Sequence, residues 1–404
     1  MDIETLRGHI RALAALEADD APVLSCYLDV EGGYRDELGA RVRVLRRRLA
    51  GPAHAAFEEA LWRIEIFLGS QQHPGTRGTA LFARGGRHHF LLPLQFQVPL
   101  PNRIVMDAMP HVYGLVELED TYHRYMVLIA ALDHVRILEV SLGEVTRELW
   151  LEQPGLGATV GNRSTREHHQ PPRRDRSTGF IEEAIAVLDR IVAQGGHTHL
   201  ILAGNPDIAS RLRAALPRRL GKQLIDVVPS STSDRLADIV AATLSRFIDR
   251  EEEESLEAVA LLVQQLRRND LAVCGTEPSL EALASGQVDQ LVMAGSYQPA
   301  PGWECAACGA PGLGPAPTSC PRCGGPRCRP VDLREKLVRL AELQGCHIEL
   351  VRHSDRLMEV GGVGCLLRFV PPGGPDWRPR PASAPPASVR PAPGSARRTA
   401  APGS

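Results

Sequence analysis

The feature that most constrains the fold is a pair of C-x-x-C-G motifs in the last third of the chain. In each motif, two residues separate the cysteines, so both thiolates can bind one ion, and the following glycine permits a tight turn beneath the sulfurs. The motifs contain Cys305/Cys308 and Cys320/Cys323, with eleven residues between them. Four thiolates at this spacing predict a structural Zn²⁺ site that leaves no position for water. The alternatives are a loop of free thiols and an iron–sulfur site.

Length and composition allow a soluble protein of two or three domains, since 404 residues exceed the size of a single ordinary core. The apolar fraction of 43% is ordinary for such proteins. The formal net charge of −2 provides no general attraction to nucleic acid, so any such affinity must come from local patches. Only Lys222 and Lys336 are lysines, which indicates a coding bias toward arginine and weakens arginine clusters as evidence of recognition.

The remaining cysteines do not suggest a disulfide framework. Four of them lie in apolar, strand-like contexts typical of buried thiols: Cys26, Cys274, Cys346 and Cys365. Cys328 lies near the two motifs but belongs to neither. The N-terminus is amphipathic and acidic, unlike a signal peptide. No apolar run approaches the roughly 18 residues that a membrane span needs. We therefore expect a cytoplasmic protein with no membrane partner.

The hydrophobic pattern predicts an α/β multidomain chain. Residues 1–120 alternate helical and strand patterns, and residues 121–245 begin with three strand-like runs in a meander and continue with alternating helices and strands. That order predicts a ribonuclease H-like middle domain. Between its third strand and first helix lies a polar segment, 152–177, too long for an ordinary connection.

A long helix over about 233–268 should lead into the last domain. We interpret Glu251–Glu254 on that helix as a solvated face and a domain boundary. Residues 246–370 then predict a small α/β/α layer domain, interrupted between Met293 and Asp332 by the cysteine segment 303–324. Residues 371–404 contain almost no large apolar side chains and predict a disordered tail.

The order of these parts over about residues 120–370 resembles the archaeo-eukaryotic class-I peptide chain release factor and Pelota superfamily, most closely its bacterial members. The supporting stretches are 180–188 (FIEEAIAVL), 200–206 (LILAGNP) and 271–293 (LAVCGTEPSLEALASGQVDQLVM). The resemblance implies a ribonuclease H-like middle domain with a long functional loop. It also implies a C-terminal domain similar to proteins that bind kink-turn RNA, with a zinc ribbon inserted in it.

The segment 152–177 departs from that family, because it holds no Gly-Gly-Gln motif with which to position water at the peptidyl-tRNA ester. Its lone Gln170 is a weak candidate for a catalytic, water-positioning residue. The segment is basic, and on the resemblance it could order on ribosomal RNA; otherwise it is a solvated loop with compositional arginine. The candidate RNA-binding residues are Arg163, Arg166, His168, His169, Arg173, Arg174 and Arg176.

The resemblance implies a ribosome-associated translation factor that binds the ribosomal A site. Because the Gly-Gly-Gln motif is missing, we expect it to act in hibernation, protection or rescue rather than in hydrolysis, although the sequence does not settle whether it is an enzyme. The expected partners are the ribosome, its RNA and a translational GTPase, with a monomer off the ribosome. One alternative is a peptidyl-tRNA hydrolase or release factor that acts through 152–177; another is a regulatory protein that has left the ribosome. The clusters Arg46–Arg48 and Arg218–Arg219 could contact RNA, but we interpret Arg46–Arg48 as a solvated helix face because it lies on a predicted helix beside Leu45 and Leu49. No phosphate-binding loop of an NTPase is present.

Overall fold

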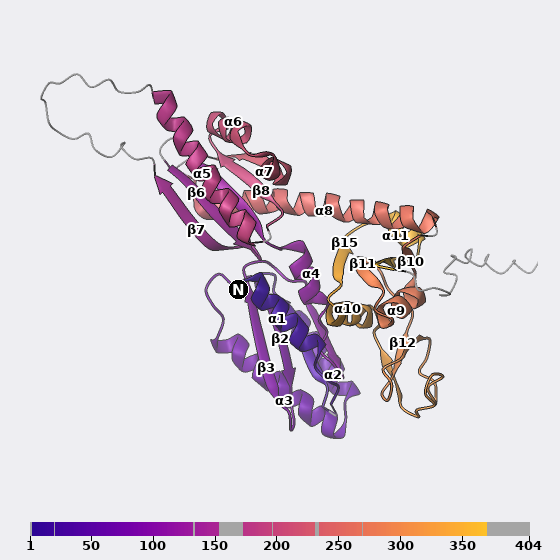
Figure 1. Ribbon diagram of the computed structural model, residues 1–404. Helices are drawn as coiled ribbons and strands as arrows, with labels where there is room; N and C mark the ends of the chain where they lie inside the picture. Colours follow the sequence, from indigo (N-terminus) through magenta and orange to yellow (C-terminus); the bar gives the residue numbers. More distant parts are fainter. Residues whose placement is uncertain are drawn as a thin grey trace, which may run out of the picture.

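The computed structural model describes residues 2–19, 21–131, 134–152, 173–195, 197–230, 234–268 and 270–369. Within these residues the strands form four sheets, with the orders β3-β2-β1-β4, β7-β6-β5-β8-β9, β10-β16-β11-β15 and β13-β12-β14. Three of the sheets carry helices, and the long helix α8 runs between two of them (Figure 1). This is the multidomain α/β architecture that the sequence predicts. The tail 371–404 lies outside the described residues.

The N-terminal sheet is antiparallel throughout and has helices on both faces. Alternation along its central strand explains this, because Leu24 and Cys26 pack toward one core and Val23 and Tyr27 toward another. The last strand and helix of this part were not predicted from the sequence. The elements are α1 (Ile3–Ala14), β1 (Val23–Asp29), α2 (Tyr34–Arg48), α3 (Gly51–Ser70), β2 (Gly78–Arg84), β3 (Phe90–Phe96), β4 (Arg103–Asp107) and α4 (Tyr113–Thr121).

The middle sheet begins with the predicted antiparallel meander, β5–β6–β7, and then adds β8 and β9 parallel to β5. Asn205 caps the helix after β8, since its side chain accepts a hydrogen bond from the Asp207 amide at 2.9 Å, and Pro206 follows it as expected. The elements are β5 (Tyr125–Ala130), β6 (His134–Ser141), β7 (Glu144–Glu152), α5 (Arg173–Gly195), β8 (Leu200–Gly204), α6 (Pro206–Ala215), α7 (Arg218–Gln223) and β9 (Leu224–Pro229).

The predicted long helix, α8 (Leu236–Arg268), joins the middle sheet to the C-terminal sheet (Figure 1). Its first half buries Ile239 and Phe247 in the middle core, and its second half buries Val259 and Leu262 in the C-terminal core. The cysteine segment forms a small separate sheet between β11 and α10, at the predicted insertion point. The remaining elements are β10 (Ala272–Cys274), α9 (Thr276–Ala284), β11 (Val288–Ala294), β12 (Gly302–Cys305), β13 (Pro311–Leu313), β14 (Cys328–Val331), α10 (Leu333–Gln344), β15 (His347–Val351), α11 (Asp355–Glu359) and β16 (Val363–Leu367).

The N-terminal and C-terminal sheets are joined through α10, although they lie at opposite ends of the sequence. Both contribute to one continuous hydrophobic cluster. The Glu335 carboxylate accepts hydrogen bonds from the backbone amides of Val112 and Tyr113 at the start of α4, where orphan N–H groups and the helix dipole favour an anion. Arg339, 4% exposed, donates to the carbonyls of Ala14 and Pro110 at 2.7 and 3.0 Å. Side chains of α10 thus form hydrogen bonds with unpaired backbone groups at the end of α1 and at the start of α4.

Candidate functional site

The four cysteines of the two motifs converge on one point in the small sheet β13-β12-β14. Their sulfur atoms all lie within 4.8 Å of one another, with Cys305 Sγ 3.6 Å from Cys323 Sγ and Cys308 Sγ 3.7 Å from Cys320 Sγ. Zinc–sulfur bonds of about 2.3 Å in a tetrahedron place the sulfurs roughly 3.8 Å apart. The donor set and its spacing therefore suit one tetrahedral ion.

The glycines after each motif have the backbone conformation that the sequence argument requires. Gly309 and Gly324 adopt φ angles of +68° and +72°, the left-handed region that a side chain disfavours. Their amides donate to the carbonyls of Cys305 and Cys320 at 2.9 and 2.8 Å, which closes each turn beneath the sulfurs. A Cβ on Gly325 would lie 3.2 Å from Cys323 Sγ, so the backbone passes close to the thiols.

The thiols are polarised by the backbone. The N–H groups of Cys308 and Ala307 point at Cys305 Sγ and lower the pKa of that thiol to about 6. At Cys323 the Gly325 amide lowers the pKa, but the neighbouring sulfurs of Cys308 and Cys305 raise it, to about 12 on balance. Without a cation, the crowded thiols cannot all ionise together. A divalent ion would remove this conflict by compensating the charge of the thiolates.

A buried ion pair attaches this sheet to the C-terminal part. Glu304 on β12 contacts the Lys336 ammonium on α10 and accepts a hydrogen bond from Arg329 Nη2 at 2.9 Å. Glu304 and Lys336 are 5% and 9% exposed. Gly302 allows β12 to approach α10, because a Cβ there would lie 2.2 Å from Leu333 Cγ. Cys328 pairs with Cys305 across the strands but is not part of the four-sulfur cluster.

The C-terminal end of the segment 152–177 is helical, which the sequence analysis did not predict. Helix α5 already begins at Arg173, so the prediction of a loop through 177 is wrong at its C-terminal end. Two prolines directly precede Arg173 in the sequence, and proline is tolerated at the first turn of a helix but not in its interior. Arg173, Arg174 and Arg176 therefore lie on the first turns of α5. Outside the described residues are Arg163, Arg166, His168, His169 and Gln170.

The other arginine clusters make internal ion pairs. Arg46 donates to both carboxylate oxygens of Glu58, at 2.7 and 2.8 Å. Arg219 donates to the carboxylate and the carbonyl of Asp189. The contact of Arg46 agrees with the interpretation of Arg46–Arg48 as a solvated helix face, whereas RNA contact by Arg218–Arg219 stays a prediction.

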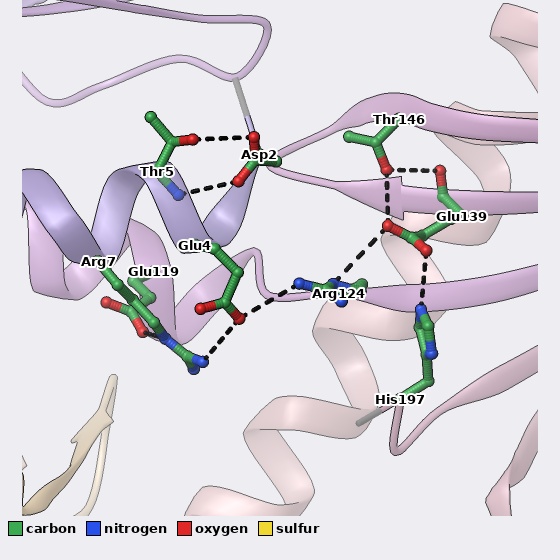
Figure 2. Close-up of polar contacts among 9 residues, drawn as sticks. All are labelled: Asp2, Glu4, Thr5, Arg7, Glu119, Arg124, Glu139, Thr146 and His197. Atoms are coloured by element: carbon green, nitrogen blue, oxygen red, sulfur yellow. Dashed lines mark hydrogen bonds and ion pairs between the residues drawn. The ribbon is translucent and has the colours of Figure 1, made fainter. Parts of the chain in front are cut away.

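A polar seam joins α1 to the middle sheet (Figure 2). Arg124 lies between Glu4, at 3.4 Å, and Glu139, at 3.8 Å. Glu139 also contacts His197 Nε2 at 3.1 Å, while Arg7 pairs with Glu119 of α4. These side chains come from α1, α4, the residue before β5, strand β6 and the connection between α5 and β8 (Figure 2). The seam borders a cavity of about 600 Å³ at the junction of α1, the middle sheet, α8 and β15.

Glu251 of α8 faces this junction cavity, so the interpretation of Glu251–Glu254 as a solvated face is wrong for this residue. Its carboxylate contacts His123 Nε2 at 3.3 Å and His199 Nδ1 at 3.4 Å. Burial, together with the charges of Glu254 and Glu349, raises the pKa of Glu251 to about 8. The only sequence signal of this cluster was a histidine just before each of two strands that pair in parallel, and that signal is weak without the pairing.

Residues 110–247 match the family described as bacterial archaeo-eukaryotic release factor family 10. This part of the chain is therefore similar to a bacterial family of the archaeo-eukaryotic release factors, in line with the resemblance seen in the sequence. The matched residues run from the start of α4 through the middle sheet into α8. They therefore include the junction histidines and the connection from β7 to α5, but not the four cysteines.

Among solved structures, the chain aligns with an archaeal translation termination factor, aRF1, at 18% identity over 91% of this chain and 99% of that chain, with a TM-score of 0.25. It aligns with Pelota of Archaeoglobus fulgidus at 15% identity over 72% and 80% of the two chains, with a TM-score of 0.34. It aligns with a ribosome-bound archaeal Pelota, from a model with ABCE1, at 12% identity over 72% of this chain and 77% of that chain, with a TM-score of 0.41. No curated protein matches the chain. No helix among the described residues is both long and apolar enough to cross a bilayer.

Proposed function

We propose that this chain is a ribosome-associated translation factor that occupies the ribosomal A site in hibernation, protection or rescue. The family match over residues 110–247 carries the proposal, because it covers the middle sheet from which release factors extend their functional loop. In this proposal the factor acts in the cytoplasm, as a monomer off the ribosome. It binds by contact with ribosomal RNA and with a translational GTPase.

The proposed domains are 1–120, 121–245 and 246–370, followed by the tail 371–404. The strand order β7-β6-β5-β8-β9, an antiparallel meander continued by parallel strands, supports a ribonuclease H-like middle domain. The insertion of the cysteine sheet between β11 and α10 supports a C-terminal domain of the kink-turn-binding type with a zinc ribbon at 303–324. In that ribbon Cys305, Cys308, Cys320 and Cys323 would hold a structural Zn²⁺.

The ends of the molecule suit different contacts. The last residues of β7 and the first turn of α5 lie at the far end of the middle sheet from the cysteine sheet (Figure 1). Residues 152–177, which include the connection between these two elements, contain five arginines and three acidic residues, Glu152, Glu167 and Asp175. We propose that this end contacts ribosomal RNA through phosphates, and that the C-terminal end faces the GTPase partner or the intersubunit space.

The missing Gly-Gly-Gln motif favours occupancy over hydrolysis, because nothing else in the segment has the sequence pattern used to position water at an ester. The substitution Gln170→Ala distinguishes occupancy of the A site from hydrolysis of peptidyl-tRNA. We expect no robust peptide release from stalled ribosomal complexes with either the unmodified chain or this variant. A strong release activity that the substitution abolishes would establish the hydrolase instead.

Co-sedimentation with 70S ribosomes tests the proposal directly. Binding should be clear at low salt and should weaken steeply with added salt, since phosphate contacts release counterions. The variant R163Q/R166Q should bind more weakly and with a shallower salt dependence, whereas R47Q/R48Q, on the exposed surface of α2, should bind like the unmodified chain. Absence of binding at low salt would contradict every ribosomal role.

A further inference from the structure

The junction cavity contains a second set of side chains of the metal-binding type. Atoms of His123, His199 and Glu251 all lie within 4.8 Å of one another. His123 precedes β5 and His199 precedes β8, and these strands pair in parallel, with the Met126 amide donating to the His199 carbonyl at 3.0 Å. Parallel pairing therefore places both imidazoles at the same edge of the middle sheet, where α8 brings Glu251 over them.

The hydrogen bonds of the two imidazoles direct their lone pairs to the same carboxylate. His123 Nδ1 lies 3.1 Å from the Asp120 carbonyl, which can only accept, so Nδ1 carries the hydrogen and Nε2 is free to bind. His199 Nε2 lies 3.0 Å from Glu254 Oε1 and donates to it, which leaves Nδ1 as the basic nitrogen. A histidine whose second nitrogen donates to a carboxylate or carbonyl is the usual arrangement of a metal ligand.

The distances fit an ion better than a hydrogen bond. Glu251 Oε1 lies 3.3 Å from His123 Nε2 and 3.4 Å from His199 Nδ1, and metal bonds of about 2.0–2.1 Å in a tetrahedron separate ligands by roughly 3.3–3.4 Å. Yet, within the described part of the chain, no group meets the geometry of a hydrogen bond to this buried oxygen. A cation between the two basic nitrogens and the carboxylate oxygen would be bound by all three at these distances.

The site is rigid and its surroundings are acidic. Phe247, one turn before Glu251 on α8, is fully buried and lies with its ring centroid 5.0 Å from that of His123 and 5.6 Å from that of His199. This contact fixes both imidazoles against the helix. Carboxylates outnumber arginines among the residues that line the cavity. A divalent cation would therefore be attracted to this cavity.

We propose that His123, His199 and Glu251 bind one divalent transition-metal ion of the zinc class, with Glu254 as the carboxylate that orients His199. Three protein ligands leave one position for water or for the Thr198 hydroxyl, which lies 2.8 Å from His199 Nδ1 and must give up its hydrogen bond to that nitrogen when the ion binds. The ion would join α8 to the middle sheet at the point where α8 leaves it for the C-terminal part. This site does not depend on the proposed ribosomal role.

Cobalt binding tests the site in the full chain. In a C305S/C308S background, one equivalent of Co²⁺ should give weak visible d–d absorption without a sulfur charge-transfer band, because the ligands of the proposed site are nitrogen and oxygen. The nearly isosteric E251Q substitution in that background should abolish the signal. The control H347Q changes a histidine that lines the same cavity outside the cluster, and it should leave the signal unchanged.

Zinc titration of the same proteins provides the second measurement. E254Q should retain one site but bind Zn²⁺ about 10–100-fold more weakly, the usual effect of losing a carboxylate that orients a ligand. The unmodified chain should bind two zinc ions and E251Q one. Failure of the C305S/C308S protein to bind Co²⁺, together with equal zinc stoichiometry in E251Q and the unmodified chain, would overturn the proposal.

Discussion

The cysteine cluster and the histidine–glutamate cluster bring potential ligands equally close together but are assembled differently. The four thiols come from nineteen consecutive residues, whose turns place them on one point. The two imidazoles and the carboxylate come from three segments spread over residues 123–251, and strand pairing and a long helix bring them together. A site whose ligands lie close together in the sequence can therefore be recognised from their spacing. A site whose ligands come from distant segments can be recognised only in the folded chain.

The two clusters should also depend on metal to different degrees. The cysteine sheet buries few apolar side chains, chiefly Trp303 and Ala310 beside two of the cysteines themselves. The other cluster lies on the established core around Tyr125 and Phe247, whose rings stack with centroids 4.5 Å apart. An ion is therefore expected to fold the first site but only to tighten the second.

The largest expected effect is from C305S/C308S. It should abolish binding of the proposed zinc ion and with it an apparent binding free energy of about 10–16 kcal/mol, typical of structural zinc sites. Hydrogen exchange should then become fast throughout β12–β14 but remain slow in β11 and β15, because those strands belong to a separate core. The matched variant E251Q should leave exchange in every sheet unchanged. Loss of protection across the whole chain in C305S/C308S would show that the ribbon is not an independent insert.

A smaller effect is expected where the ribbon meets α10. Lys336→Met leaves the buried Glu304 paired only with Arg329 and should lower the free energy of unfolding by on the order of 3 kcal/mol. Urea denaturation measures this change. The control is Arg46→Gln, which breaks an ion pair with side chains 47% and 34% exposed and should cost under about 1 kcal/mol. Equal costs in the two variants would mean that the ribbon pair contributes no more than a surface contact.

The smallest effect concerns Glu342, a cavity carboxylate outside the second cluster. Burial, and next the charge of Glu119, raises the pKa of Glu342 from its ordinary 4.5 to about 7. Because the folded chain then binds a proton that the unfolded chain releases, this contribution to stability is present below pH 4.5 and is lost as the pH rises to about 7.

The variant Glu342→Gln should therefore raise the free energy of unfolding at pH 8 by on the order of 1–3 kcal/mol and change it little at pH 4.5. Urea denaturation at the two pH values measures the difference. A stabilisation that is the same at both values would show that packing, and not charge, explains the effect.

Much of the local structure was predictable, because short-range preferences decide it. The Asn205–Pro206 helix start, the β5–β7 meander and the turns at Gly309 and Gly324 each follow from a few adjacent residues. The long-range contacts were not predictable in this way. Nothing near Glu335 in the sequence indicates that its carboxylate caps α4, over two hundred residues earlier.

The sequence alone determined the four-cysteine motif, its place inside an α/β unit and the resemblance to release factors, because spacing and element order are properties of the linear chain. Only the tertiary structure decided that Glu251 turns from solvent toward two histidines, and that the two ends of the chain share one core. The physical reason is that burial and pairing depend on which surfaces meet. The parallel pairing of β5 with β8 and the path of α8 create a charged junction that no stretch of sequence contains.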